Sequence, residues 1–140
     1  MTTAPMVLFV CVRNSGKSQM AAGLMHQAAG GRVVALSAGT DPGTKLNALS
    51  VAALGEVGVD IADGYPKPVD AELLAAADLV VILGREARID APDGVRLLRW
   101  ETDEPSEREI EGIQRMRLVR DDIAARVRAL ATELSPAVQS

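Results

Sequence analysis

The stretch MVLFVCVRNSGKS, residues 6–18, decides the fold. Its first five residues form a continuous apolar run, which is typical of a strand buried on both faces of a parallel sheet. A polar loop containing a glycine follows directly. From Ser18 onward, apolar residues recur at helical spacing until the pair Gly30 and Gly31 ends the pattern. A buried strand, a tight loop and a helix in this order predict a β-α unit of an α/β fold.

The rest of the chain repeats this alternation. Further strands are predicted at 32–37, 78–83 and 95–100, and further helices at 45–57, 70–77 and 109–134. Strands that alternate with helices predict a parallel, doubly wound sheet with right-handed crossovers. We therefore expect an α/β fold with a single domain over residues 1–140, in which helices flank a four-stranded sheet of order 2-1-3-4. In that order the first strand lies at the topological switch point, where such sheets bind ligands, and Cys11 stands at its carboxyl end.

Composition limits the classes of function. The 140 residues are 48% hydrophobic and only 2% aromatic, with a net charge of -4, which fits one soluble domain whose core is filled by aliphatic side chains. No basic block interleaved with aromatics suggests a nucleic-acid partner. No apolar run approaches the roughly 20 residues that cross a bilayer, so no membrane partner is expected. The opening MTTAPMVLFVC lacks the basic segment of a signal peptide, and we expect a cytoplasmic protein.

The loop after the first strand favours oxyanion chemistry. Gly16-Lys17-Ser18 matches the end of a nucleotide-binding P-loop, but that motif requires glycine where this chain has Cys11. Successive backbone N–H groups and the start of a helix instead predict a cradle for a tetrahedral anion. On this interpretation the substrate-binding residues are Val12, Arg13, Asn14, Ser15, Gly16, Lys17 and Ser18.

Individual side chains of the loop suit this chemistry. The helix start and nearby cations favour the thiolate form of Cys11, the form that acts as a nucleophile. Lys17 supplies a point charge beside the anion, and Arg13 is a second candidate cation. Ser18 is expected both to donate its hydroxyl to the thiolate and to cap the helix. Asn14 tolerates a positive φ and can fix the loop. The alternative is that Cys11 is a buried structural residue.

Cysteine and histidine counts exclude other mechanisms. Cys11 is the only cysteine and His26 the only histidine, so the chain has no internal disulfide, no Cys-His protease site and no zinc site. We expect no metal. Any redox reaction therefore requires a thiol from another molecule.

The segment VLFVCVRNSGKSQMAAGL closely resembles the catalytic loop of the low-molecular-weight tyrosine phosphatase superfamily, whose signature is Cys-x5-Arg-Ser. RVVALSAGT, PKPVDAELLAAADLVVILG, RWETDEPSE and MRLVRDDI are similar to its arsenate reductase branch. The resemblance implies that Cys11 is the nucleophile, with Ser18 as its hydroxyl partner and Asn14 as the loop-stabilising residue. It also implies that the catalytic acid is Glu104, which precedes Pro105 and follows Asp103. The alternative for this acidic pair is a solvated loop.

The chain departs from that family pattern in three places. Lys17 replaces the signature arginine, which removes a planar, bidentate grip on the anion. Gly84 and Ala91 stand where the thioredoxin-coupled reductases have further cysteines. Ala22 and Lys67 stand where some relatives have acidic potassium ligands, so the Lys67 ammonium is a candidate replacement for the ion. The alternative is that Lys67 is an ordinary surface lysine.

A single-cysteine member with this loop is similar to the arsenate–mycothiol transferases of mycothiol-producing bacteria. The resemblance implies that arsenate is joined to the thiol co-substrate mycothiol, that a mycoredoxin then releases arsenite, and that no cofactor is tightly bound. This division of labour suits a chain that supplies one thiol. Two alternatives stay open: a phosphatase that works through a phosphocysteine, and a non-catalytic oxyanion-binding module.

Overall fold

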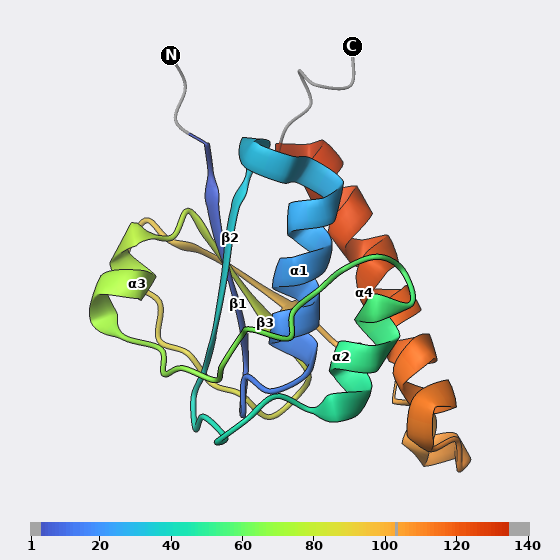
Figure 1. Cartoon of the computed structure of the whole chain (residues 1–140). Helices are drawn as coiled ribbons and strands as arrows, with labels where there is room; N and C mark the ends of the chain where they lie inside the picture. Colours follow the sequence, from blue (N-terminus) through green and yellow to red (C-terminus); the bar gives the residue numbers. More distant parts are fainter. Residues whose placement is uncertain (1–3, 103, 135–140) are drawn as a thin grey trace.

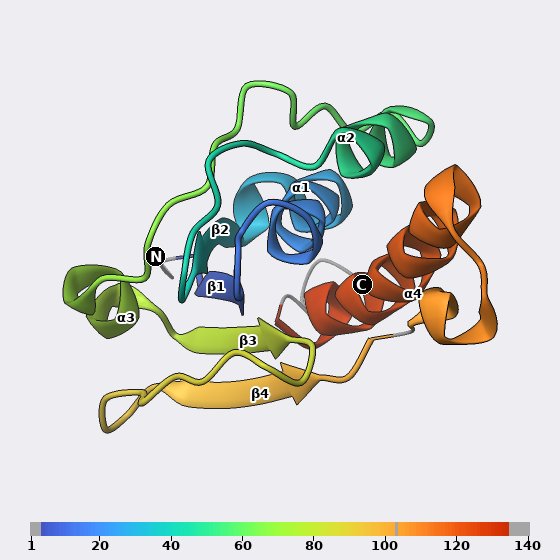
Figure 2. The ribbon, with the colours of Figure 1, turned by 90° about the horizontal axis from the view of Figure 1, so that it is seen from below.

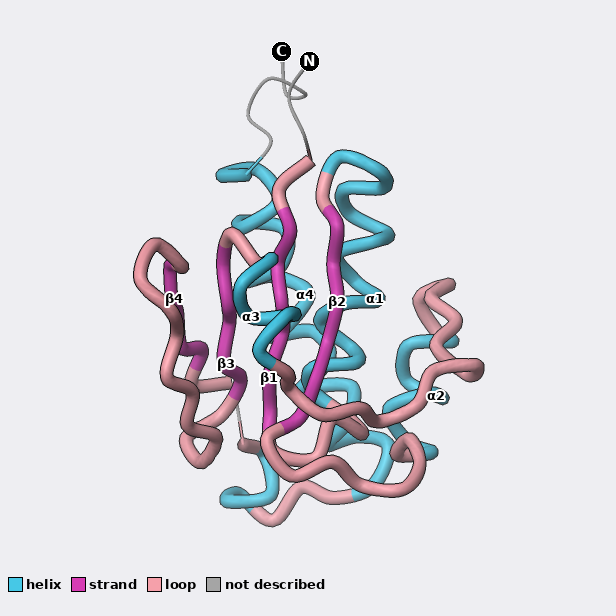
Figure 3. Tube along the Cα trace, turned by 90° about the vertical axis from the view of Figure 1, so that its left-hand side faces the viewer, coloured by secondary structure: helices cyan, strands magenta, loops and turns pink. Residues whose placement is uncertain are grey.

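The computed structural model describes residues 4–102 and 104–134. Four parallel strands form a single sheet in the order β2-β1-β3-β4, which confirms the predicted topology. Figure 3 shows the strands side by side, with their carboxyl ends at one edge of the sheet. The strands are β1 (Met6–Cys11), β2 (Val34–Gly39), β3 (Leu79–Leu83) and β4 (Arg96–Trp100).

Helices cover both faces of this sheet. Helices α1 and α4 lie against one face and α3 lies on the other, while α2 packs on α4 at the outside of the helical layer (Figures 1 and 2). Their bounds are α1 (Lys17–Ala29), α2 (Ala48–Gly55), α3 (Ala71–Ala76) and α4 (Gly112–Leu134), with 3-10 turns at Gly30–Arg32 and Pro105–Arg108. No helix of the described residues is both long and apolar enough to span a bilayer.

Alternate residues of β1 and β3 supply two cores. Val7 and Phe9 of β1 pack with the apolar residues of α1 and α4, and the Phe9 ring lies 5.8 Å from that of Trp100. Leu8 and Val10 point to the other face, toward α3. Because β1 is buried on both faces, the position of its last residue, Cys11, and of the loop that follows is fixed by the core.

The second strand and the last helix do not begin where the sequence predicts. The second strand is shifted from 32–37 to Val34–Gly39, because Gly30–Arg32 forms a 3-10 turn and Gly39 pairs with Cys11. The last helix begins at Gly112 instead of residue 109. Glu109 and Gly112 have φ values of 62° and 69°, in the left-handed region, so the α-helix does not extend further back.

The second helix is shorter than the predicted 45–57. Asn47 caps it, because its Oδ1 accepts a 3.0 Å hydrogen bond from the Ser50 N–H. Its far end is tied to α4 by Glu56, which accepts a 2.6 Å hydrogen bond from Arg117. This hydrogen bond from Arg117 is the main reason why the pKa of Glu56 is lowered to about 2. Helix α2 is thereby fixed beside the loop that contains Cys11.

Candidate active site

Cys11 is the last residue of β1, and Lys17 is the first residue of α1, so five residues make the turn between them. The thiol is 9% exposed. Its Sγ lies 3.0 Å from the Ser18 Oγ and accepts a hydrogen bond from the backbone N–H of Asn14 at 3.2 Å. Asn14 has φ 54°, the left-handed conformation expected for it. The loop therefore curls around the sulfur atom.

The carbonyl groups of this loop are bonded from behind by the segment that follows β2. The carbonyl oxygens of residues 11, 12, 13 and 15 accept hydrogen bonds of 2.7–3.1 Å from residues 40–47; the pairs are Cys11 with Thr40, Val12 with Asp41, Arg13 with Gly43 and Ser15 with Asn47. In a trans peptide the C=O and the next N–H point in opposite directions. The N–H groups that follow these carbonyls, those of residues 12, 13, 14 and 16, therefore point away from the backing segment.

These N–H groups point to the side of the loop on which the thiol lies, because the Asn14 N–H is among them and it bonds Cys11 Sγ. The N–H groups of Val12, Arg13 and Gly16 have no acceptor among the residues that the structure describes. Unbonded N–H groups that converge beside a cysteine form a cradle for an oxyanion.

Gly39 allows the backing segment to lie this close to the loop. A Cβ added at Gly39 would lie 2.6 Å from the Val12 carbonyl oxygen and 3.0 Å from the Asn14 nitrogen, both of them backbone atoms. Any other residue at this position would push the loop away from β2. The absence of a side chain at the end of β2 thus sets the position of the cradle.

The side chain of Asn14 fixes the direction of the contact between Ser18 and Cys11. Its Oδ1 accepts from the backbone N–H of Lys67 at 3.0 Å, and that group is only a donor, so its Nδ2 must face Ser18, to which it donates at 2.7 Å. The Ser18 hydroxyl accepts this bond and keeps its own proton for Cys11. Asn14 and Ser18 are both fully buried. The thiolate thus gains two donors, the Ser18 hydroxyl and the Asn14 N–H.

Ser18 does not cap the helix, and that part of the sequence prediction is wrong. The N-cap of α1 is Gly16, and no side chain bonds there, because the Ser18 hydroxyl is occupied by Asn14 and Cys11. The sequence analysis also missed Gln19. Its Nε2 donates to the Asn14 carbonyl oxygen at 3.1 Å and to the Tyr65 carbonyl oxygen at 3.0 Å. Its only signal was a polar residue at the buried start of an amphipathic helix.

A cavity of about 400 Å³ opens over Cys11. Lys17 lines it and donates a hydrogen bond to Glu104 Oε1, so these two predicted residues come together although 87 residues separate them in the sequence. Asp103, the other predicted acid, lies outside the described residues. The remaining lining residues are Val12, Leu83, Gly84, Arg85, Glu86 and Glu107.

Arg13 and Arg85 differ in their position relative to this cavity. Arg13, a predicted anion ligand, donates to Asp41 at 2.8 Å, its side chain is 61% exposed, and it does not line the cavity. The prediction that Arg13 adds charge to the anion site through its side chain is therefore not met in this state. Arg85, which follows β3, lies in the wall of the cavity.

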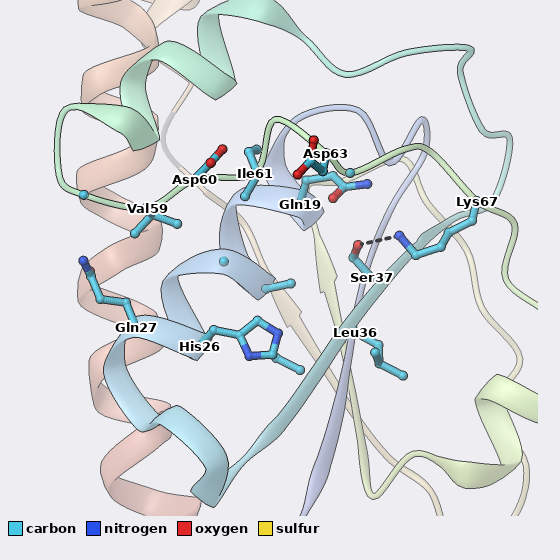
Figure 4. A pocket seen from close by; sticks show the side chains of 15 residues that line it. Gln19, His26, Gln27, Leu36, Ser37, Val59, Asp60, Ile61, Asp63 and Lys67 are labelled. Atoms are coloured by element: carbon cyan, nitrogen blue, oxygen red, sulfur yellow. Dashed lines mark hydrogen bonds between the residues drawn. The ribbon is translucent and has the colours of Figure 1, made fainter.

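Lys67 lies behind the loop, at a second cavity of about 590 Å³ between α1, β2 and residues 58–67 (Figure 4). Its ammonium is 3.4 Å from the Ser37 hydroxyl and 3.3 Å from the Tyr65 carbonyl oxygen, and it lies 5.3 Å from the centre of the Tyr65 ring. Burial lowers the pKa of Lys67. These neutral oxygens are ligands that a monovalent cation would also use, which agrees with the predicted replacement of such an ion by Lys67. Among the described residues, no three His, Cys, Asp or Glu side chains lie together so that they could hold a metal ion.

Comparisons with known proteins place this geometry in context. The family model of low molecular weight phosphotyrosine protein phosphatase matches residues 6–140. A putative arsenate reductase of Halobacterium salinarum is 33% identical over 134 residues, which cover 91% of this chain and 92% of that protein.

Solved structures show the same likeness. A thioredoxin-dependent arsenate reductase of Corynebacterium glutamicum superposes with a TM-score of 0.82 at 32% identity, and the match covers 97% of this chain and 64% of that chain. This chain therefore spans less than two thirds of that relative. An arsenate reductase in a phosphate-binding state superposes with a TM-score of 0.81 at 27% identity, covering 94% of this chain and 99% of that one.

Proposed function

The chain belongs to the low molecular weight phosphotyrosine protein phosphatase family, and we propose that it is an arsenate reductase that joins arsenate to the thiol mycothiol. One observation carries the proposal: the free thiol of Cys11 lies at the base of a cradle of unbonded N–H groups, in a chain with no second cysteine. The cradle around Cys11 supports oxyanion chemistry. The lack of a second cysteine supports a thiol donor from another molecule.

Arsenate binds first, with its oxygens on the N–H groups of the cradle. The start of α1 adds a favourable dipole, and the Lys17 ammonium adds a charge. Lys17 contacts Glu104, so a bound anion shares this ammonium with the carboxylate. The relatives that carry the name arsenate reductase support this choice of anion.

The chemistry then starts at the sulfur. The Cys11 thiolate, held by Ser18 and the Asn14 N–H, attacks arsenic, and one hydroxyl group of the arsenate gains a proton and leaves as water. Glu104, which contacts Lys17 at the cavity, takes up a proton from solvent and passes it to that hydroxyl group. Arsenic remains As(V) in the resulting S–As bond, because no electrons have been transferred to it.

External thiols complete the reduction. A mycothiol thiolate attacks arsenic, forms a new S–As bond and expels the Cys11 thiolate. A mycoredoxin thiolate then attacks the sulfur of mycothiol in this adduct. The S–As bond breaks with its electron pair on arsenic, so As(III) leaves as arsenite and a mixed disulfide remains. This chain supplies only the first thiol.

One experiment tests the proposal and its alternatives. Purified protein is given arsenate with mycothiol and mycoredoxin, with thioredoxin and its reductase, or with neither, and arsenite is measured; a parallel assay follows the hydrolysis of an aryl phosphate. Arsenite formed only in the mycothiol arm supports the full proposal. Arsenite formed in the thioredoxin arm would support an arsenate reductase but would reject mycothiol as its thiol donor. Aryl phosphate hydrolysis with no arsenite in any arm makes the protein a phosphatase.

A further inference from the structure

The turn after β3 has a fixed backbone. Arg99 donates from Nη1 to the Gly84 carbonyl oxygen and from Nη2 to the Ala87 carbonyl oxygen, each at 2.8 Å. Arg88 donates to the Arg85 carbonyl oxygen at 2.7 Å, and the Ala87 side chain is buried in the core. The turn is thereby a rigid support beside the cavity over Cys11.

The guanidinium of Arg85 is held much more loosely than this backbone. It lies 3.4 Å from a Glu101 oxygen and 3.9 Å from a Glu107 oxygen, its side chain is 65% exposed, and it makes no hydrogen bond among the described residues. Its N–H donors are therefore free to bond an incoming ligand, at the wall of the cavity that contains the thiol.

The other cation of this cavity is already engaged. Lys17 donates to Glu104, and the carboxylates of Glu86 and Glu107 add further negative charge to the wall. An oxyanion that enters next to a thiolate therefore needs another cation. Arg85 is the lining residue that has both the charge and the free donors.

A tetrahedral anion bound in the cradle has one substituent that the N–H groups of the cradle do not bond. Its inner oxygens bond the N–H groups beside Cys11, and the remaining substituent points outward into the cavity. In inorganic arsenate or phosphate that substituent is a bare oxygen, which accepts charge-assisted hydrogen bonds. In a phosphate ester it carries an organic group, and in a phosphonate it is carbon, so the bare oxygen is lost.

We propose that Arg85 determines substrate specificity by donating to this outward oxygen, so that the site prefers inorganic oxyanions to phosphate esters. A planar guanidinium from the turn after β3 then supplies the fork that Lys17 cannot supply from the loop. The proposal rests on the proposed function for the choice of arsenate as substrate. It does not depend on the identity of the thiol donor.

The test measures binding at Cys11 without turnover. Iodoacetamide alkylates the thiol, and a ligand in the cradle protects it; the concentration that halves the rate is determined for inorganic phosphate, for arsenate and for phenylphosphonate. Wild type is compared with Arg85→Ala, Arg85→Lys and the control Arg96→Ala, which removes an exposed arginine that is paired with Glu133 and does not line the cavity. For each variant, the alkylation rate with ligand is divided by the rate of the same variant without ligand. Circular dichroism checks that each variant is folded.

Arg85→Ala is expected to raise the half-protecting concentration of phosphate and arsenate by about tenfold, the scale of one charge-assisted hydrogen bond, and to leave that of phenylphosphonate within about twofold. Arg85→Lys should fall between wild type and Arg85→Ala, and Arg96→Ala should match wild type. Equal weakening of all three ligands, or no weakening of phosphate, overturns the proposal. Failure of arsenite production in every thiol arm would reject the proposed function and leave this binding result unaffected.

Discussion

The two lysines on opposite sides of the Cys11 loop have opposite surroundings. Lys17, at the front, lines the reaction cavity and pairs with a carboxylate, Glu104. Lys67, at the back, contacts the Ser37 hydroxyl, the Tyr65 carbonyl oxygen and the Tyr65 ring, all of them neutral. Burial lowers the pKa of Lys67, and no carboxylate among the described residues compensates for it.

The side of the loop with Lys17 therefore takes part in anion binding and catalysis, whereas the side with Lys67 holds the loop in place. The front carries groups that gain or lose contacts when an anion arrives. The back carries contacts that are complete without a ligand, because Asn14 already bonds Ser18 and the Lys67 backbone. We therefore expect front substitutions to change rates and anion affinity, and back substitutions to change stability first.

Replacement of the nucleophile should separate catalysis from binding most completely. Cys11→Ser is expected to abolish arsenite formation, because serine lacks the thiolate, while phosphate binding persists on a cradle whose carbonyl contacts with residues 40–47 remain. Activity assays and calorimetry with inorganic phosphate measure the two effects. Activity within tenfold of wild type would remove Cys11 from the mechanism.

Asp103 and Glu104, which are neighbours in the sequence, should differ in their effect on turnover. Glu104→Gln should slow turnover by about 10²–10⁴-fold, the usual contribution of a positioned acid. Asp103→Asn, outside the described residues, should slow it less. Steady-state rates of both variants at saturating arsenate decide the matter, and a greater sensitivity of Asp103 would reverse the assignment.

Changes at Lys17 should alter the balance between two activities. We expect wild type to show little aryl phosphatase activity. Lys17→Arg should raise it by about tenfold, because a rigid fork grips two oxygens of the phosphoryl group where lysine offers one mobile charge. Lys17→Ala should weaken phosphate binding by about the same factor. Efficient hydrolysis of an aryl phosphate by wild type would contradict the role given to this lysine.

Replacement of Lys67 should have the smallest effect on rate and a pH-dependent effect on stability. Its folded-state pKa lies below the value of 10.5 that applies to the unfolded chain, so in the window between them only the unfolded state holds the proton. Raising the pH through that window therefore stabilises the folded wild type. Urea unfolding at about pH 8 and about pH 10 should show wild type gaining stability relative to Lys67→Met.

The matched control is Lys45→Met, at an exposed lysine that lacks these contacts. It should follow wild type at both pH values. A loss of stability of wild type relative to Lys67→Met as the pH rises would contradict the assigned cause.

Sequence reasoning predicted the parts of this molecule that depend on neighbouring residues. The apolar run before Cys11, the glycine-containing loop and the helix after it belong to one continuous stretch, so their periodicity predicts a β-α unit with the thiol at the end of its strand. The left-handed conformation of Asn14 was foreseen for the same reason, since asparagine favours it locally.

The remaining features depend on contacts between distant segments. The bonds from residues 40–47 to the loop carbonyls are made by backbone atoms, which no residue type reveals. The cap assigned to Ser18 was wrong because Asn14 and Cys11 compete for its hydroxyl. The position of Arg85 in the cavity wall likewise depends on how the turn after β3 is held by Arg99.

The backbone at Gly84 limits where a second thiol could be introduced. Its φ of 95° is strained for every residue with a side chain, although a Cβ added there would make only ordinary van der Waals contact with Lys17 Nζ, at 3.9 Å. The obstacle is thus the conformation of the chain and not a lack of space. A relay between Cys11 and a thiol at residue 84 would therefore first require the turn after β3 to adopt another conformation.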